Sequence, residues 1–361
     1  MKRPSLQLLG LAEGTVLTGP HSIHLDITNG CNTNCITCWD HSPLLDIRRP
    51  RQWKRQRVEL REMETLLDDA LGLGGLEAIV LSGMGEPFTH PRVYDLIRAV
   101  KERGLHLTVI TNLVAADAER IIELGVDQLL IGIHGASEAA YRAFHPSFRR
   151  NEWSRLHAML SRFRDAGRAY KHVQVVCDVN AHELVEMVEL GSEYGAQQVT
   201  FKLASLKAGT QDCRIRPEQR EELLESLLPR ARARAQSLGV HTNLSVFAMQ
   251  LEAMQSDRAG GATAPIRDIG CFMGHSYARI LVDGTVLYCC NVDVKVGHLD
   301  EARFSELWHG PSWNALRARM RRGEYFDSCN QCGKLNQNQA IRERVRKHFG
   351  EAKLREITGA Q

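Results

Sequence analysis

The sequence has no long apolar run and little imbalance of charge. No stretch approaches the roughly 18 apolar residues that cross a bilayer, and the segment after Met1 is too short and too interrupted for the core of a secretion signal. The 46 lysines and arginines stand against 43 acidic residues, which leaves a net charge of +3. So small an excess does not indicate general nucleic-acid binding. We expect a cytoplasmic protein with no membrane or nucleic-acid partner.

Cysteine is abundant by comparison, with ten residues in a chain that shows no export signal. Such cysteines favour a reducing compartment and metal binding over disulfides. Cys31, Cys35 and Cys38 form a Cys-x3-Cys-x2-Cys array on one short segment. Three thiolates can hold three irons of a [4Fe-4S] cluster and leave the fourth iron open for chemistry. A zinc knuckle or a structural cluster is the alternative, although structural zinc usually has four protein ligands.

The array resembles the signature of the radical S-adenosylmethionine (SAM) superfamily, with Trp39 as the aromatic residue beside the third cysteine. A later segment, Gly83-Met-Gly-Glu-Pro87, resembles the Gly-Gly-Glu-Pro of that family, with Met84 where a glycine is common. The resemblance implies that SAM binds the open iron and is cleaved to a 5′-deoxyadenosyl radical. That radical would remove a hydrogen atom from an unreactive carbon of the substrate.

The Gly-Met-Gly-Glu-Pro segment suggests two binding roles. Gly83 and Gly85 would let the backbone approach a ligand closely, and the resemblance implies that Glu86 accepts a hydrogen bond from the ammonium group of SAM. A turn of this composition is by itself common at the end of a strand. Its place one strand-helix unit after the cysteine array favours a cofactor site.

Hydrophobic periodicity predicts six strands with helices between them. Such alternation implies a parallel sheet that binds its ligands at the carboxyl ends of the strands. The resemblance implies an α/β fold, a partial (β/α)6 barrel. The expected strands are 22–27, 78–82, 106–111, 128–133, 173–179 and 198–203, and the expected helices are 59–72, 91–103, 115–124, 151–166 and 181–194. A charged helix over 217–239 and a further strand over 240–246 are expected to follow.

Other strand ends resemble segments that face SAM or the substrate in this family. Thr111 and Asn112, followed by Leu113, resemble a Thr-Asn-Gly segment, and His134 stands where an aspartate is common. Lys202, on the sixth strand, could meet a carboxylate of SAM or of the substrate. Two plainer roles stay open: His134 as a hydrogen-bonded wall residue, and Lys202 as a lysine that extends outward to water.

A smaller C-terminal unit is predicted to begin with a β-hairpin, whose two-residue turn is Asp283-Gly284. Small residues over 256–265 indicate a linker before it. We divide the chain into an N-terminal segment (1–20), the barrel (21–245), a linker (246–270) and a C-terminal domain (271–361). The cysteines of that domain are Cys271, Cys289, Cys290, Cys329 and Cys332.

The C-terminal cysteines resemble those of SPASM and twitch domains, which hold auxiliary clusters in many radical SAM enzymes. Because no cysteine follows Cys332, the match is to the shorter twitch form, a β-hairpin plus helix with one auxiliary [4Fe-4S] cluster. Adjacent strand residues point to opposite faces, and the spacing from Gly284 in the resembled domains selects Cys289 over Cys290. The implied ligands are Cys271, Cys289, Cys329 and Cys332. A structural four-cysteine zinc site is the alternative.

Three functions fit these motifs. The first is oxidation of a small polar metabolite, such as a sugar or cyclitol, with the auxiliary cluster accepting an electron. The second is modification of a ribosomally made peptide by crosslinking, thioether formation or epimerisation, although the N-terminal segment is expected to be too short for a leader-binding module. The third is a non-catalytic iron-sulfur electron-transfer protein.

Two further features bear on partners and on the reaction. The basic run 48–57 could contact an anionic substrate or a reductant such as flavodoxin or ferredoxin, or could be a solvated helix entry. Cys290 is a candidate hydrogen donor to a substrate radical, since it lies outside both expected cluster sets. Its plainer role is that of a small buried apolar residue.

Overall fold

The computed structural model describes residues 3–148, 151–168, 170–206, 209–254 and 263–359. Its strands form one sheet in the order β6-β5-β4-β3-β2-β1-β7-β8-β9. The strands are β1 (Ser22–Asp26), β2 (Ala78–Ser82), β3 (His106–Thr111), β4 (Gln128–Gly132), β5 (Lys171–Val176), β6 (Gln198–Leu203), β7 (Tyr277–Ile280), β8 (Thr285–Leu287) and β9 (Lys295–His298).

Each expected helix is present with bounds shifted by a few residues, and the structure adds further helices that the sequence analysis did not predict. None of those among the described residues combines the length and the apolar character that a bilayer crossing requires. The helices are α1 (Leu6–Glu13), α2 (Arg51–Lys54), α3 (Leu60–Gly72), α4 (Val93–Glu102), α5 (Ala118–Glu123), α6 (Glu138–Phe144), α7 (Glu152–Asp165), α8 (Leu184–Glu193), α9 (Pro217–Glu222), α10 (Leu228–Leu238), α11 (Leu244–Ala253), α12 (Ile266–Ile269), α13 (Phe304–His309), α14 (Pro311–Arg321) and α15 (Leu335–Thr358).

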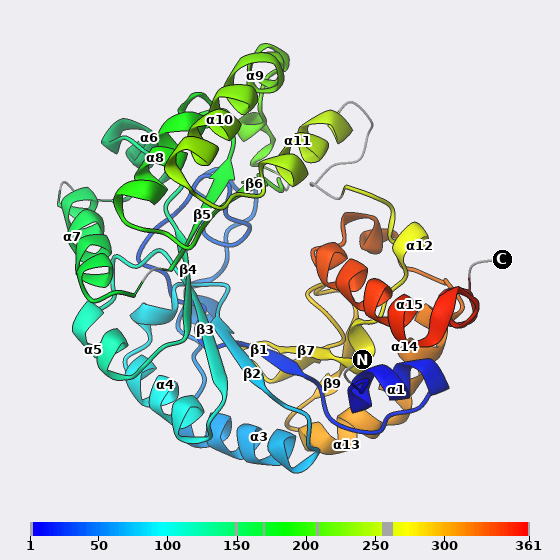
Figure 1. Ribbon diagram of the computed structural model, residues 1–361. Coiled ribbons are helices and arrows are strands. Elements are labelled where there is room, and N and C mark those ends of the chain that lie inside the picture. Colours follow the sequence, from blue (N-terminus) through cyan, green and yellow to red (C-terminus); the bar gives the residue numbers. More distant parts are fainter. Residues whose placement is uncertain (1–2, 149–150, 169, 207–208, 255–262, 360–361) are drawn as a thin grey trace.

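Strands β1 to β6 pair in parallel with their chain neighbours, as the strand-helix alternation predicts. Figure 1 shows this sheet curved, with helices such as α3, α4, α5 and α7 along its outer face. Side chains alternate along each strand, so Ile23 and Leu25 of β1 are buried against the helix layer while His24 between them faces inward. The carboxyl ends of the strands therefore meet around one lumen.

The C-terminal domain continues the barrel sheet. Strand β7 pairs with β1 in parallel and places Arg279 beside His24. Strands β8 and β9 then extend the sheet antiparallel. The predicted hairpin is confirmed, but its turn is longer than the two residues expected. The Gly284 amide donates to the Leu281 carbonyl at 2.9 Å, so Val282 and Asp283 are the central residues, and Gly284 follows them at φ 88°, a left-handed conformation that suits glycine. Because hydrogen bonds fix β7 to β1, side chains of the auxiliary domain lie next to those of the barrel lumen.

The strand expected over residues 240–246 is wrong. Only Thr242 forms a single bridge, with Val199 of β6, and α11 begins at Leu244. The side chain of Asn243 accepts a hydrogen bond from the Phe201 amide at 2.7 Å and donates one to the Phe201 carbonyl at 2.9 Å. One amide side chain thus replaces a neighbouring strand at this sheet edge. Most of the linker expected over 256–265 lies outside the described residues.

Candidate functional site

The cysteine array follows β1 at the mouth of the barrel. Backbone hydrogen bonds hold this loop: the Ile36 amide donates to the Phe144 carbonyl at 3.0 Å, and the Cys38 amide donates to the Cys35 carbonyl at 3.0 Å. All three thiols are largely enclosed by protein, and burial raises their pKa values, that of Cys31 to about 12. Three soft sulfur donors on one loop are the donor set that an iron-sulfur cluster selects.

The two glycines of the Gly-Met-Gly-Glu turn lie against the segment that leads from β1 to the cysteine loop. A Cβ atom on Gly83 would lie 2.2 Å from the Thr28 carbonyl oxygen, and one on Gly85 would lie 1.9 Å from that of Gly30. This close approach requires glycine at both positions, and their expected contact with a ligand stays a prediction. The amide of Glu86 donates to the Gly30 carbonyl at 2.8 Å, so the turn and the loop form one backbone unit.

Glu86 is buried at the centre of that unit, with 4% of its surface exposed. Its Oε1 accepts hydrogen bonds from the hydroxyl of Thr111 at 2.5 Å and the amide of Phe88 at 3.2 Å, and its Oε2 accepts one from the amide of Asn112 at 2.7 Å. A carboxylate offers about four acceptor positions, so one stays available for an ammonium group. Burial raises the pKa of Glu86 to about 7 in the absence of such a cation.

Glu86→Gln is expected to weaken SAM binding by about 1.5–3 kcal/mol, the range for hydrogen bonds to charged groups. The change removes the charge and can turn an amide donor toward the Asn112 amide. Equilibrium binding of SAM to anaerobically reconstituted protein measures the effect. Glu138→Gln, at an exposed ion pair with Arg142, is the matched control and should leave the affinity unchanged. Equal affinities in both variants would show that the turn has been misread.

Thr111 and Asn112, the expected Thr-Asn segment, form hydrogen bonds with Glu86 and with the cysteine loop. Besides the bonds to Glu86, the amide side chain of Asn112 donates to the side-chain oxygen of Asn32 at 2.8 Å. Leu113, which stands where the resembled segment has glycine, adopts a φ of 70°. That left-handed conformation is uncommon for leucine, and it supports the alignment of the two segments.

His134 is placed in the barrel wall. Its Nδ1 accepts a hydrogen bond from the Val175 amide at 3.0 Å, and its ring packs on Phe144 with centroids 4.5 Å apart. Burial, together with the charges of His145 and Lys202, lowers its pKa well below the usual value. These contacts agree with the role of a neutral wall residue, which the sequence left open, and His134 also adopts a φ of 65°. Its contact with the cofactor stays a prediction.

Trp39 and Lys202 both face the open interior. Trp39 is 40% exposed and donates its indole hydrogen to the Ser205 carbonyl at 2.6 Å. Lys202 is exposed to solvent inside the barrel, since its neighbours Phe201 and Val199 point to the helix layer. The surrounding protein nevertheless lowers its pKa by partial desolvation. Its position favours the inward role over an outward extension to water.

The five C-terminal cysteines line one cavity of about 1290 Å³, which Trp39 and Met84 line from the barrel side. Among the described residues, no three histidine, cysteine or carboxylate side chains converge closely enough for a single metal ion. A cubane does not need such convergence, because its thiolates bind different irons. The cysteines concerned are Cys271, Cys289, Cys290, Cys329 and Cys332.

The strand-alternation argument for Cys289 over Cys290 is not supported. Strand β8 ends at Leu287, so both cysteines lie on a bent segment beyond it. Their thiols share a hydrogen bond, which raises the pKa of Cys289 and lowers that of Cys290. The Cys290 sulfur also lies next to Gly333. Both thiols therefore face the same cavity, and only the spacing from Gly284 still selects Cys289.

Iron content distinguishes the two cysteines. On the spacing argument, Cys289→Ala should lose about four irons of about eight, while Cys290→Ala should retain all of them. Anaerobic reconstitution followed by iron and sulfide determination measures this. If Cys290→Ala alone lost the four irons, Cys290 would be the ligand and its role as a hydrogen donor would be excluded.

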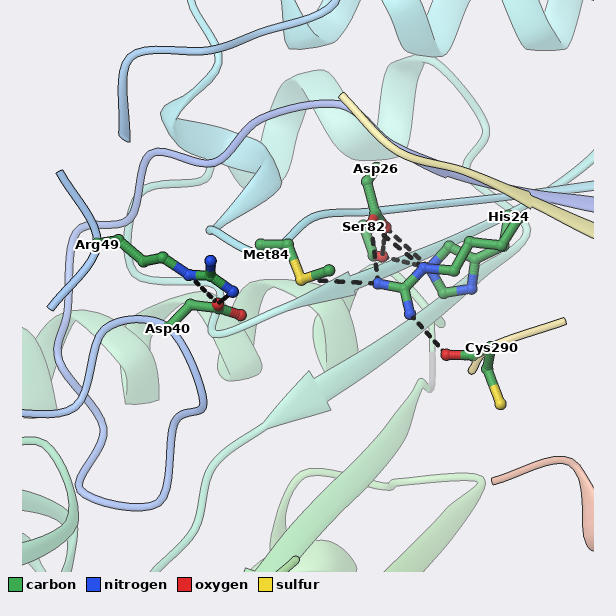
Figure 2. A network of polar contacts seen from close by, with 8 residues as sticks. His24, Asp26, Asp40, Arg49, Ser82, Met84 and Cys290 are labelled. Carbon is green, nitrogen blue, oxygen red and sulfur yellow. Dashed lines mark hydrogen bonds and ion pairs between the residues drawn. The ribbon is translucent and has the colours of Figure 1, made fainter. Parts of the chain in front are cut away.

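A buried polar network in the lumen was missed by the sequence reasoning. The guanidinium of Arg279 forms an ion pair with Asp26 at 2.7 Å, and Ser82 donates to the other oxygen of Asp26 at 3.1 Å. His24 contacts Ser82 as well. Figure 2 shows His24, Asp26 and Ser82 gathered at one point, with Met84 nearby. The alternation of His24 and Asp26 in β1 could have shown that they share a face.

Arg279 joins this network to both cofactor regions. Its Nη2 lies 4.0 Å from the Met84 sulfur, and its Nη1 donates to the Cys290 carbonyl at 3.4 Å. The nearby Lys334 ammonium lies 4.0 Å from the centroid of the Tyr277 ring. Burial raises the pKa of Asp26 although Arg279 acts in the opposite direction. Burial and the charges of Arg279 and Lys334 lower the pKa of His24, so it is neutral.

Two family models match the chain. The model of the radical SAM superfamily covers residues 25–191, and that of the SPASM iron-sulfur cluster-binding domain covers residues 271–333. Together they span most of the chain and include both cysteine sets. The first model covers the barrel and the second covers the auxiliary domain, which are the two regions that Arg279 connects.

Curated relatives and solved structures agree with these matches. An AdoMet-dependent heme synthase of Methanosarcina barkeri is 24% identical over 80% of this chain and 82% of its own. A PqqA peptide cyclase of Ruegeria pomeroyi is 23% identical over 91% of this chain and 83% of its own. The structure of Streptococcus suis SuiB bound to S-adenosylmethionine superposes with a TM-score of 0.64 at 16% identity, over 91% of this chain and 74% of SuiB. The chain therefore belongs to the radical SAM superfamily, with SAM and a [4Fe-4S] cluster as cofactors and a C-terminal SPASM-type domain for auxiliary iron-sulfur.

Proposed function

We propose that this enzyme abstracts a hydrogen atom from an anionic peptide and thereby modifies it. The observation that carries the proposal is the size and charge of the cavity between the two cysteine sets. Its volume of about 1290 Å³ exceeds the range of about 300–1,000 Å³ that small-ligand pockets usually have. An auxiliary cluster occupies part of that space, and the remainder suits a peptide segment better than a single small metabolite.

The charge of the cavity favours carboxylates on the substrate. Arg279 and Lys334 line it, and both are partly buried. The charge of Arg279 is already balanced by Asp26, so Lys334 contributes more to a site for a carboxylate. The carboxylates of the lining, Asp293 and Asp327, are exposed at its rim. Arg267 is a third, exposed cation of the lining, and Lys202 of β6 lies outside the lining although its charge acts on Lys334. A carboxylate bound to a half-buried cation gains a charge-assisted hydrogen bond, which is stronger than a neutral one.

Relatives support a peptide substrate. SuiB has been crystallised with the precursor peptide SuiA, and the structure of anSMEcpe with a bound peptide superposes with a TM-score of 0.59. The curated relatives include PqqA peptide cyclases. Neighbours with such low identity support the fold. The choice of a peptide over a small metabolite as the substrate depends on the cavity.

The cluster held by Cys31, Cys35 and Cys38 would supply reductive cleavage of SAM and so the radical that abstracts hydrogen. The protein's own residues position the partners. Glu86 would orient the SAM amine, and Trp39 would close the cavity on the side of the cysteine loop. Lys202 would hold a substrate carboxylate, so that the reacting carbon stays near SAM and away from water. We further propose a flavodoxin or ferredoxin as the reductant and a cytoplasmic location.

Oxidation of a small sugar-like or cyclitol-like metabolite is the second candidate. The set of four expected ligands, Cys271, Cys289, Cys329 and Cys332, favours it, because one closed auxiliary cluster fits a net two-electron oxidation.

One experiment separates the two. Cells of the source organism are grown in deuterated medium, and their extract is divided at about 1 kDa. Each fraction is incubated with reconstituted enzyme, SAM and reductant, and deuterium in 5′-deoxyadenosine is measured by mass spectrometry. If the substrate is a peptide, deuterium should be transferred to 5′-deoxyadenosine from the larger fraction. Treatment of that fraction with peptidase should abolish the transfer. Transfer only from the smaller fraction, insensitive to peptidase, would overturn the peptide proposal in favour of a metabolite.

A further inference from the structure

A second cleft, of about 560 Å³, lies in the C-terminal domain apart from the cavity between the cysteine sets. It forms where the end of α1 meets the short helix Met273–His275, the end of α13 and one face of α14. Figure 1 shows α1, α13 and α14 together on this part of the molecule. The side chains that give it chemical character are Glu13, His275, His309, Asn314, Arg317 and Arg321.

Arg317 is a buried cation without an acidic partner. It is 7% exposed, and its Nε and Nη1 donate to the carbonyls of Gly274 and Trp308, each at 2.8 Å. Its Nη1 also donates to the side-chain oxygen of Asn314 at 2.8 Å. Its Nη2 has no hydrogen-bond partner, and within the described ranges no carboxylate reaches ion-pair distance of it. Its guanidinium carbon lies 4.5 Å from the centroid of the Trp308 ring, which offsets part of the charge. A buried charge without a counter-ion is costly.

The groups around Arg317 add positive potential and neutral donors. Arg321 is a second guanidinium, and its Nη2 pairs with Glu356 at 2.8 Å. His275 and His309 are held neutral, because burial and the charge of Arg317 lower both pKa values, that of His275 to about 3. A neutral imidazole still offers one N–H donor. Glu13 is the acidic side chain of this lining, and it is exposed at the rim.

These observations fit one class of ligand. Two guanidinium groups and the imidazoles of His275 and His309 line a space large enough for a phosphoryl group with part of the molecule that carries it. The Asn314 side chain holds Arg317 and the His309 carbonyl in place. We propose that this cleft binds a phosphate group, either free phosphate or the phosphoryl group of a metabolite, at a site separate from the SAM and substrate cavity. The bound anion would supply the counter-charge that Arg317 lacks.

Isothermal titration of the cluster-loaded full-length protein with inorganic phosphate, at constant ionic strength kept with chloride, tests the proposal. We expect one saturable site, at least a tenfold loss of affinity in Arg317→Gln and no change in Arg346→Gln. The control removes the same charge from an exposed ion pair with Glu343 on α15. Absence of saturable binding, or equal affinity in all three proteins, would overturn the site.

Because Arg317 also bonds two backbone carbonyls, Arg317→Gln can fail to fold. His309→Ala and Asn314→Leu then replace it, since His309 lines the cleft from the end of α13 and Asn314, in the first turn of α14, positions Nη1 of Arg317. Each should weaken phosphate binding at least threefold with full iron content, and unchanged affinity in both would reject the proposal. Titration with glycerol 3-phosphate identifies the source: tighter binding than phosphate by tenfold or more indicates a metabolite, and equal binding indicates free phosphate.

Discussion

Replacing Cys31, Cys35 and Cys38 together by alanine is expected to abolish reductive cleavage of SAM and to lower the iron content from about eight atoms to about four. The three thiols lie on one loop that no auxiliary cysteine joins, so the second cluster should remain. Iron and sulfide determination, with chromatographic assay of 5′-deoxyadenosine, measures both outcomes in one preparation.

Cys177 and Cys213 provide the matched control. Both are buried near the loop but belong to neither cluster set. Their double replacement by alanine should leave iron content and SAM cleavage close to those of the unaltered protein. Continued 5′-deoxyadenosine production by the triple variant would reject the loop as the catalytic one. A stoichiometric zinc with only four irons in the unaltered protein would reject the auxiliary cluster.

Arg279→Gln is expected to destabilise the protein by about 3–5 kcal/mol, because it leaves a buried carboxylate without its partner. The Asp26 side chain is fully buried, and the guanidinium lies 2.7 Å from it. The shift in urea midpoint of the cluster-loaded protein measures the loss. Adding Asp26→Asn should recover part of it, since the uncompensated charge is then removed.

Arg92→Gln is the control for that measurement. Its ion pair with Asp95 has a similar length, 2.9 Å, but both side chains are exposed to solvent. Exposed pairs contribute about 0–1 kcal/mol, so the midpoint should hardly move. If Arg279→Gln had an equally small effect, the buried network would not connect the barrel to the auxiliary domain as described.

The parts of the fold that depend on local pattern could be predicted from the sequence. Strands β2, β3 and β6 have the predicted bounds, because apolar alternation reports which face is buried. The pairing of β7 with β1 could not be predicted, since it joins segments some 250 residues apart and no local pattern encodes it. The strand expected over 240–246 failed because a side chain, Asn243, satisfies the edge of β6.

The candidate site divides in the same way. The cysteine loop, Glu86 and Trp39 could be found from motif spacing. Arg279 could not, because its contact with Asp26 depends on that long-range pairing. The contact of Gly83 and Gly85 with the cysteine loop could not be predicted for a related reason: what a missing Cβ would meet is a property of the folded chain. Their contact with the cysteine loop explains why the two motifs occur together.

The assignment of this chain as a radical SAM enzyme, as opposed to an electron carrier with two clusters, is tested most directly by one measurement. Anaerobically reconstituted, unaltered protein is incubated with SAM and dithionite, and methionine and 5′-deoxyadenosine are quantified over time. We predict that both form in equal amounts, dependent on the reductant. Protein that holds about eight irons and binds SAM, yet yields no 5′-deoxyadenosine, would contradict the assignment.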